Sequence, residues 1–198
     1  MKKLYFKYGA MGSSKTAQAL MVKFNYEQKG HRVFLFKPRC DNRCVENGKA
    51  FVASRIGLKS ECVEFSKNDN LFNLCQQLGV LNPQYVEKNI VMIDECQFLT
   101  TLQVEQLKKL SLFVTVLCFG LLTNFKTELF EGSKRLVELA DSIKEIKSIC
   151  SCGRKATINA RLNNGRVVTD GVEIAIGGDE AYESMCYYCY KQKRSGCK

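Results

Sequence analysis

Long apolar runs, histidine and extended blocks of one charge are what this sequence has least of. No apolar run approaches the roughly 18 residues that a membrane-spanning helix needs, so we expect no membrane segment. Lys2 and Lys3 precede a strand-like segment that is too short and too polar for the apolar part of a signal peptide, so secretion is not expected. His31 is the only histidine, and we expect it at the surface rather than in a metal site.

The cysteine content indicates the cellular compartment, and the net charge indicates which kinds of partner are compatible with the chain. Eleven cysteines without a secretion signal indicate a reducing compartment, so we expect a cytoplasmic protein whose thiols bind metal or lie buried rather than form disulfides. The formal net charge of +10 is compatible with nucleic-acid binding. However, the lysines are spread along the chain, and no long basic block appears before residues 191–194. A solvated surface together with a polyanionic small substrate explains the charge equally well.

Strand-like and helix-like segments alternate through the first three quarters of the chain. Strand signals fall at residues 4–8, 33–36, 62–65, 90–93 and 114–119, and helix-like segments at 15–29, 71–78, 102–110 and 133–140. This alternation predicts an α/β fold with a mainly parallel sheet and helices on both faces. Pro38 opens an expected long loop. From about residue 149 short segments with cysteine, glycine and asparagine take over, so we predict one domain over residues 1–148 and a small second one over 149–198.

The first predicted strand runs directly into a turn of small residues, a lysine, a threonine and a helix. The turn and the residues after it are Gly9, Ala10, Met11, Gly12, Ser13, Ser14, Lys15 and Thr16. This order is typical of a loop that binds the phosphates of a nucleoside triphosphate. Backbone N–H groups converge on the phosphates, the lysine reaches the outer oxygens, the hydroxyl ligates Mg²⁺ and the helix N-terminus adds positive charge. Ser14 stands where the usual pattern has its second glycine.

A second half of such a site follows the predicted strand at 90–93. Asp94 and Glu95 come directly after this apolar run. In proteins with a phosphate-binding loop of this kind, a buried strand delivers an aspartate beside the loop, where it holds the Mg²⁺ shell. Because neighbouring side chains on an extended end point in different directions, one acid can face the metal and the other a second substrate. We therefore predict that Asp94 and Thr16 serve Mg²⁺, and that Glu95 is the general base for the attacking hydroxyl.

Two closely spaced cysteine pairs mark the predicted second domain. They are Cys150 with Cys152, and Cys186 with Cys189. The segment between the pairs carries its own turn signals at residues 163–165 and 177–178. Four thiolates arranged in this way close the tetrahedral shell of a structural zinc ion. The first pair has one residue between its cysteines where two are usual, and four buried, reduced thiols are the alternative interpretation.

Several sequence blocks taken together resemble one known family. They are residues 9–16, Asp41-Asn42-Arg43, Ser54-Arg55-Ile56-Gly57, Asp94-Glu95-Cys96-Gln97-Phe98, Phe125 with Glu128-Leu129-Phe130-Glu131-Gly132, and Ile176-Gly177-Gly178 leading to Tyr182-Glu183-Ser184. Over residues 3–190 the chain resembles the thymidine kinases that carry a zinc-binding lasso. The resemblance implies a P-loop NTPase-like parallel sheet flanked by helices, with a small C-terminal zinc-ribbon or lasso domain that covers the nucleoside.

The resemblance also implies an activity, its cofactors and its site residues. The implied enzyme is an ATP:thymidine 5′-phosphotransferase of nucleotide salvage that uses ATP with Mg²⁺ and a structural Zn²⁺. By position, Glu95 matches the catalytic base, while Lys15, Thr16 and Asp94 match the phosphate and Mg²⁺ residues. Further contacts with ATP or its phosphates are implied for residues 9–14, Cys96, Gln97, Arg43, Arg55 and Arg161. The implied nucleoside pocket consists of Met11, Phe98, Leu121, Phe125 and Tyr182. Residues 172–182 resemble the lasso loop that folds over the nucleoside, and a homotetramer is a further expectation from the family.

A protein of another class stays open at this point. A nucleic-acid-binding ATPase with the same phosphate-binding loop could use a zinc ribbon and the positive charge to hold DNA or RNA. The ribbon does contain Arg154, Lys155, Arg161 and Arg166. Such an ATPase would need a residue that activates water in place of Glu95. The aromatic residues of the pocket and the lasso favour the kinase, so we expect thymidine and ATP as partners and no nucleic acid.

Overall fold

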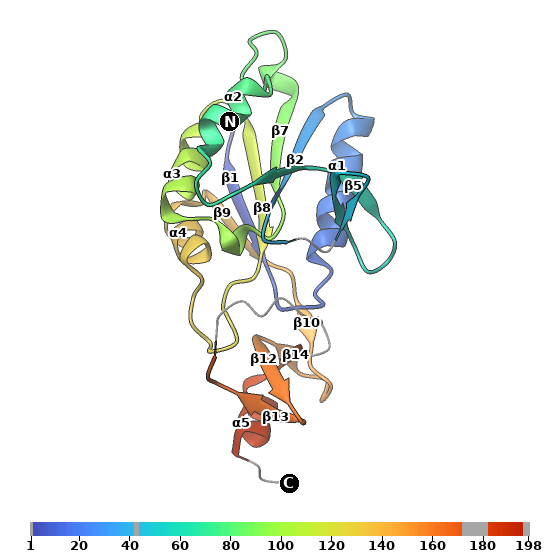
Figure 1. Cartoon of the computed structure of the whole chain (residues 1–198), viewed down its shortest axis with the longest axis vertical. Helices are drawn as coiled ribbons and strands as arrows, with labels where there is room; N and C mark the ends of the chain where they lie inside the picture. Colours follow the sequence, from blue (N-terminus) through green and yellow to red (C-terminus); the bar gives the residue numbers. More distant parts are fainter. Residues whose placement is uncertain (1, 42–43, 172–181, 196–198) are drawn as a thin grey trace.

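The computed structural model describes residues 2–41, 44–171 and 182–195. Its main layer is a six-stranded sheet in the order β6-β2-β7-β8-β1-β9, in which every neighbouring pair is parallel (Figure 1). The strands are β1 (Leu4–Tyr8), β2 (Arg32–Pro38), β6 (Val63–Phe65), β7 (Asn89–Ile93), β8 (Thr115–Gly120) and β9 (Ser142–Glu145). The prediction of a parallel α/β fold is confirmed.

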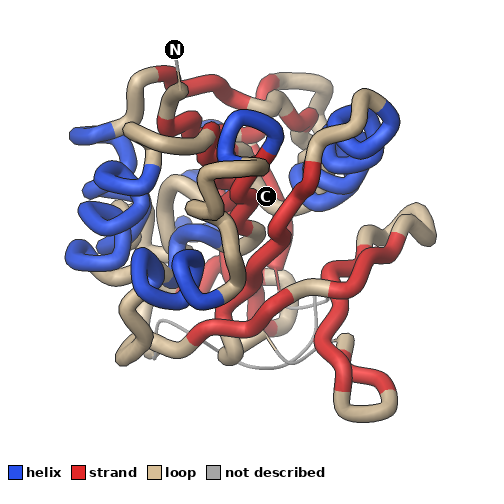
Figure 2. The backbone as a smooth tube through the Cα atoms, turned by 90° about the horizontal axis from the view of Figure 1, so that it is seen from above, coloured by secondary structure: helices blue, strands red, loops and turns tan. Residues whose placement is uncertain are grey.

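Helices cover both faces of this sheet (Figures 1 and 2). One face carries α1 (Lys15–Gln28), and the other carries α2 (Leu71–Gln77), α3 (Thr101–Leu110) and α4 (Glu131–Leu139). Side chains alternate between the faces along each strand. In β7, Val91 and Ile93 pack with α2, α3 and α4, whereas Ile90 and Met92 pack with α1. Both faces are therefore apolar, as in other parallel sheets that are buried on two sides.

The four helices expected from the sequence are all present. α3 begins with a capping box, because the side chains and backbones of Thr100 and Gln103 bond reciprocally. Two short 3₁₀ turns also occur, η1 (Val86–Lys88) before β7 and η2 (Cys96–Phe98) after it. In the described part of the chain, no helix has both the length and the apolar character needed to cross a membrane.

The segment after Pro38 differs from the expected long loop. Pro38 itself ends β2, and a separate antiparallel sheet follows, made of β3 (Val45–Glu46), β4 (Lys49–Ala53) and β5 (Lys59–Glu61). Asn47 and Gly48 have φ angles of 50° and 74° at the β3–β4 turn. A two-residue hairpin turn of this kind requires positive φ at both positions, which Asn-Gly adopts readily. The loop prediction was wrong, and the Asn-Gly pair was the signal for the hairpin.

Two further elements carried no clear sequence signal. β9 is a polar edge strand that pairs with β1, and the Asp141 carboxylate just before it accepts a hydrogen bond from the Leu4 N–H at 2.8 Å. A strand with one covered edge and exposed side chains needs no apolar alternation. α5 (Tyr187–Ser195) begins directly after Cys186 and contains Cys189, in a region where only short segments were expected.

The C-terminal part has its own small core. β10 (Ser148–Ile149) pairs with β11 (Lys155–Ala156), and β12 (Ile158–Asn163) lies between β13 (Arg166–Val168) and β14 (Tyr182–Met185). Its buried residues are Cys150, Ala156, Ile158, Ala160, Met185, Cys186 and Tyr190. Asn164 and Gly165 have positive φ between β12 and β13, which confirms the turn expected there. The expected turn at 177–178 lies outside the described residues. The division into domains at residue 149 stays a prediction.

Ser14 has the backbone conformation that its position in the loop requires. Its φ of 64° and ψ of 23° place it in the left-handed region, immediately before α1. For a residue with a Cβ this region costs about 1–2 kcal/mol, whereas glycine adopts it without strain. The loop therefore keeps the shape of a glycine-containing loop at an energetic cost.

Replacing Ser14 with glycine should stabilise the protein. Relief of strain is offset by about 0.4–1 kcal/mol from the greater freedom of the unfolded chain, so the free energy of unfolding should rise by about 0.5–1 kcal/mol. Chemical denaturation of Ser14→Gly measures this change. Gln18→Gly in the exposed interior of α1 is the matched control, and it should lose about 1 kcal/mol. A Ser14→Gly protein that is less stable than the parent would contradict the strain.

Candidate functional site

The carboxyl ends of β1, β7 and β8 meet at one edge of the sheet. Residues 9–14, which we call the 9–14 loop, follow β1, and Asp94 and Glu95 follow β7. Residues 121–125, the 121–125 loop, follow β8, the strand that separates the other two. The Gly9 N–H donates to the Gly120 carbonyl at 3.3 Å, which joins the first and third of these segments.

The 9–14 loop closes tightly on itself. A side chain at Gly9 would collide with the Ile146 carbonyl and the Ser13 hydroxyl, so only glycine fits there. The Lys15 ammonium donates to the Ala10 carbonyl at 2.8 Å across the loop. The Ser13 hydroxyl is buried and has no hydrogen-bond partner among the described residues. A buried hydroxyl without a partner is costly, and a ligand in the loop would satisfy it.

The structure brings Thr16 and Asp94 together although 78 positions separate them. The Thr16 hydroxyl, in the first turn of α1, donates to Asp94 Oδ2 at 3.1 Å. Burial and the adjacent Glu95 carboxylate raise the pKa of Asp94 to about 7, and the bond from Thr16 acts in the opposite direction. Both side chains offer oxygen ligands, the kind that Mg²⁺ prefers, so this donor set fits the ion expected from the sequence.

The pKa of Lys15 responds to charges on several elements. Burial lowers the pKa of Lys15, whereas the charges of Glu95 and Asp94 raise it. The charge of Arg55, at the exposed turn between β4 and β5, lowers the pKa of Lys15 further, so it acts on the site through space. Lys15 thus lies within reach of the negative charges of both acids at the end of the sheet.

Glu95 is oriented by Gln97. The Gln97 amide donates to Glu95 Oε2 at 2.6 Å and accepts from the Leu121 N–H at 3.0 Å. Glu95 has φ 51° and ψ 40°, a left-handed conformation that is uncommon for glutamate and occurs mostly at functional sites. Ser133 in α4 adds a bond from its hydroxyl to the Leu121 carbonyl at 2.6 Å. The glutamate is therefore connected to the 121–125 loop through one buried amide.

Cys96 and Gln97 turn their side chains toward the protein interior. The Cys96 thiol is wholly buried, and burial with its bond to Cys118 raises its pKa well above the usual value. Gln97 is only 3% exposed. Contacts of these two residues with ATP, which the resemblance implies, stay predictions.

Three residues of the expected nucleoside and phosphate sites lie against one another. The Arg161 guanidinium lies 3.9 Å from the centre of the Phe125 ring, and it donates from Nε, at 2.9 Å, and from Nη2 to the Tyr182 hydroxyl. Phe125 is 2% exposed. Phe125 comes from the 121–125 loop, Arg161 from β12 and Tyr182 from β14. Two residues of the C-terminal sheet thus meet a buried residue of the loop after β8.

The other expected residues are placed less directly. Phe98 is half-buried and its ring packs edge-on to Phe130, with centroids 5.9 Å apart. Leu121 is half-buried beside Gln97. Met11 is half-buried, and its backbone N–H donates to the Asn159 side chain. Arg43 and residues 172–181 lie outside the described residues, so their expected contacts stay predictions.

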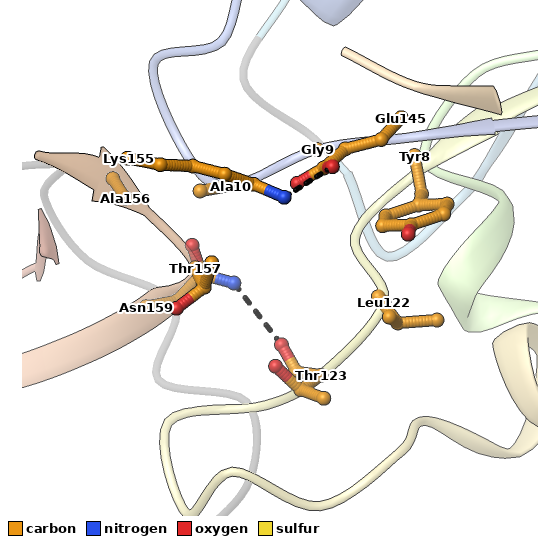
Figure 3. A pocket seen from close by; sticks show the side chains of 10 residues that line it. All are labelled: Tyr8, Gly9, Ala10, Leu122, Thr123, Glu145, Lys155, Ala156, Thr157 and Asn159. Carbon is orange, nitrogen blue, oxygen red and sulfur yellow. Dashed lines mark hydrogen bonds and ion pairs between the residues drawn. The ribbon is translucent and has the colours of Figure 1, made fainter. Parts of the chain in front are cut away.

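A cavity of about 160 Å³ lies between the start of the 9–14 loop and the C-terminal strands (Figure 3). Gly9 and Ala10 line one side, Leu122 and Thr123 another, and residues 155–157 with Asn159 the third. An ion pair between Lys155 and Glu145 crosses this region, and the Asn159 side chain points toward Thr123 (Figure 3). The sequence carried no signal for Asn159 beyond its place two residues before Arg161.

The four cysteines of the two pairs come together as expected. Their Sγ atoms all lie within 4.8 Å of one another, and Cys152 and Cys186 are 3.6 Å apart. Sulfurs that share a tetrahedral zinc ion at 2.3 Å lie about 3.8 Å apart, so the cluster could hold zinc. Hydrogen bonds from the backbones of Cys152 and Cys186 lower the pKa of Cys150 to about 6, which favours the thiolate that metals bind.

Comparison with known proteins bears directly on this arrangement. The family model described as thymidine kinase matches residues 2–190. The chain belongs to the thymidine kinase family. It is 42% identical over 195 residues to a thymidine kinase of Rhodopirellula baltica, with 97% of this chain and 89% of the relative covered. The same identity holds over 197 residues with a thymidine kinase of Pasteurella multocida, with 98% of each covered.

A third relative agrees in length as well as in sequence. A thymidine kinase of Legionella pneumophila is 42% identical over 199 residues, which cover 99% of this chain and 92% of the relative. The match to the thymidine kinase family spans the 9–14 loop, both acids, the 121–125 loop and all four clustered cysteines. The family resemblance seen in the sequence is confirmed.

The raised pKa of Asp94 predicts how stability depends on pH. Its pKa is about 7 in the folded state against an ordinary value of 3.8, so the unfolded chain loses this proton first. The contribution of the neutral carboxyl is fully present below pH 4 and is lost as pH rises through 7. Asp94→Asn keeps the neutral form at every pH, so its melting temperature should gain on the parent between pH 5 and pH 8.

Thermal unfolding of both proteins at the two pH values measures this difference. Asp170→Asn, at an exposed position, is the matched control and should show no such trend. A difference that stays constant or shrinks with rising pH would show that Asp94 is already ionised at pH 5.

Proposed function

We propose that this protein transfers the γ-phosphoryl group of ATP to the 5′-hydroxyl of thymidine. The observation that carries the proposal is the contact between Thr16 and Asp94, with Glu95 next to it. This contact brings the phosphate-binding loop next to Asp94, which can ligate a metal ion, and next to Glu95, which can accept a proton. Membership of the thymidine kinase family supports the choice of thymidine as acceptor.

The phosphates of ATP are bound by the 9–14 loop, Lys15 and the N-terminus of α1. The N-terminus of a helix attracts anions, and the Lys15 ammonium is released from the Ala10 carbonyl when phosphate oxygens replace it. Thr16 and Asp94 would hold Mg²⁺, which would neutralise negative charge on the phosphates. Arg55 and Arg161 are candidates for further phosphate contacts, as is Arg43 outside the described residues.

Glu95 takes up the proton of the 5′-hydroxyl. The bond from this oxygen to phosphorus forms while the bond from phosphorus to the leaving ADP oxygen breaks, and the hydroxyl proton passes to the Glu95 carboxylate. The bond from Gln97 to Oε2 fixes the position of the Glu95 carboxylate. Because there is little covalent work for the protein in phosphoryl transfer, positioning of these groups supplies most of the rate.

The thymine base occupies the region around Phe125. A flat, partly apolar base stacks well on aromatic rings. The resemblance implies Phe98, Leu121, Met11 and Tyr182 as the other residues that contact the nucleoside. Arg161, which lies over the Phe125 ring and bonds to Tyr182, holds these two residues together. The lasso expected at residues 172–182, of which Tyr182 alone is described, would complete the cover.

The C-terminal part serves as a zinc-stabilised support for this pocket. Cys150, Cys152, Cys186 and Cys189 hold one structural zinc ion, which closes the end of the segment that carries Arg161 and Tyr182. A domain boundary near residue 149, a cytoplasmic location and a homotetramer remain our expectations for the protein.

The nucleic-acid-binding ATPase is less well supported. Of the basic residues in the ribbon, Lys155 pairs with Glu145, Arg154 lies over the Tyr188 ring and Arg161 lies over Phe125. Each of these three basic side chains thus has a partner within the protein.

Replacing Glu95 with glutamine should keep substrate binding and abolish most of the turnover. Because only the proton acceptor is lost, kcat should fall by about 10²–10⁴ while KM for ATP and thymidine changes little. A coupled ADP-release assay across nucleosides measures this. Glu87→Gln, at an exposed glutamate, is the matched control. Near-normal turnover of Glu95→Gln would indicate that Asp94 is the base instead. If the parent protein hydrolysed ATP only with DNA and phosphorylated no nucleoside, the nucleic-acid-binding ATPase would be favoured.

Metal analysis tests the zinc site independently of activity. Protein purified without chelators should contain about one zinc per chain. Cys189→Ser should lose both the zinc and thermal stability, because one of four ligands is gone. Cys40→Ser, at an exposed cysteine outside the cluster, is the control and should keep the metal. Zinc-free parent protein that is fully folded would return the four thiols to the buried, reduced alternative.

A further inference from the structure

Asn159 is a buried side chain that joins three separate segments. It lies on β12 and is 4% exposed. Its Oδ1 accepts from the Met11 N–H in the 9–14 loop at 2.7 Å, and its Nδ2 donates to the Thr123 carbonyl in the 121–125 loop at 3.1 Å. Both ends of one amide are thus used, one toward the loop for phosphates and the other toward the loop that carries Phe125.

The contact between Asn159 and Thr123 is one of two contacts between β12 and the 121–125 loop. Asn159 and Arg161 are two positions apart on β12 and therefore share one face of the strand. Their contacts, Thr123 and Phe125, are also two positions apart. One face of the C-terminal sheet therefore follows the 121–125 loop, with Arg161 at the nucleoside side and Asn159 at the phosphate side.

The cavity increases the importance of this amide. Gly9, Ala10, Leu122, Thr123 and Asn159 all border it, so close apolar packing does not fill the space between these segments (Figure 3). Hydrogen bonds in a partly enclosed site depend strongly on geometry and leave a costly unpaired group when broken. The two bonds of Asn159 therefore add to the Gly9–Gly120 backbone bond in fixing the position of Met11 relative to Thr123.

We infer that Asn159 is a positioning residue that couples the nucleoside side of the site to the phosphate-binding loop. This inference rests on the proposed function. A nucleoside held at Phe125, Arg161 and Tyr182 fixes β12 against the 121–125 loop. Asn159 then holds the Met11 N–H in place, so the 9–14 loop has less freedom to lose when ATP binds. The coupling is reciprocal, because ATP in the loop stabilises the same two bonds.

Hydrogen exchange at the Met11 amide tests the coupling in the parent protein and in two variants. Thymidine without ATP should slow exchange at Met11 in the parent. Asn159→Ala removes both bonds, so Met11 should exchange rapidly with or without thymidine. Asn159→Asp keeps the acceptor for Met11 and removes the donor for Thr123. It should therefore keep basal protection and lose the increase with thymidine. Asn163→Ala, at an exposed position on the same strand, should behave as the parent.

Kinetics supply a second readout that a purely structural residue would not give. Asn159→Ala should raise KM for ATP about tenfold, the loss expected for one well-formed hydrogen bond, whereas Asn159→Asp should stay within about threefold. If Asn159 had only a structural role, Asn159→Asp should raise KM more than Asn159→Ala does, because a buried carboxylate disturbs folding more than a small cavity does.

The inference is overturned if thymidine leaves Met11 exchange unchanged in the parent, or if either variant keeps the increase with thymidine. The first of these outcomes needs no variant, so it stands even if Asn159→Ala fails to fold. Failure of the proposed function gives a different result: the parent would phosphorylate no nucleoside, while Met11 exchange in Asn159→Ala would still differ from that in the parent. The two failures are therefore distinguishable.

Discussion

The absence of a side chain at position 120 is the constraint on which the site depends. Gly120 ends β8, the strand between the one that leads to the 9–14 loop and the one that leads to Asp94. A Cβ at this position would lie 2.6 Å from Gln97 Oε1 and 2.7 Å from the Cys96 sulfur. The carbonyl of Gly120 accepts a hydrogen bond from the Gly9 N–H. Any larger residue would push the two halves of the site apart. The approach of Thr16 to Asp94 across β8 follows from this close packing.

The 121–125 loop continues from this point and connects the remaining parts. Its Leu121 backbone bonds to Gln97 on one side and to Ser133 on the other, and its Thr123 carbonyl bonds to Asn159. A short loop after a central strand thereby contacts the residue that orients Glu95, a helix of the main domain and the C-terminal sheet. We consider this loop the physical link between the expected base, the nucleoside pocket and the phosphate-binding loop.

Elements with a strong apolar period were predictable, and polar elements were not. The five strand signals and four helix signals fall on observed elements because burial on two faces demands continuous apolar runs in a parallel sheet. β9 was not predicted, because this edge strand is held by backbone bonds to β1 and needs no apolar side chains. The hairpin after Pro38 was not predicted, because its strands are short and polar. Asn47 and Gly48 were the sequence signal for its turn.

The sequence by itself determined the chemistry that is available: a small-residue turn with lysine and threonine, an acid pair after an apolar strand, and two cysteine pairs. Local spacing is enough for these, because each motif depends on residues within a few positions of one another. Only the tertiary structure decided that Gln97 bonds to Glu95, that Arg161 lies over Phe125, and that Asn159 joins Met11 to Thr123. Such contacts join residues as many as 148 positions apart, and they arise from how whole elements pack rather than from any local pattern.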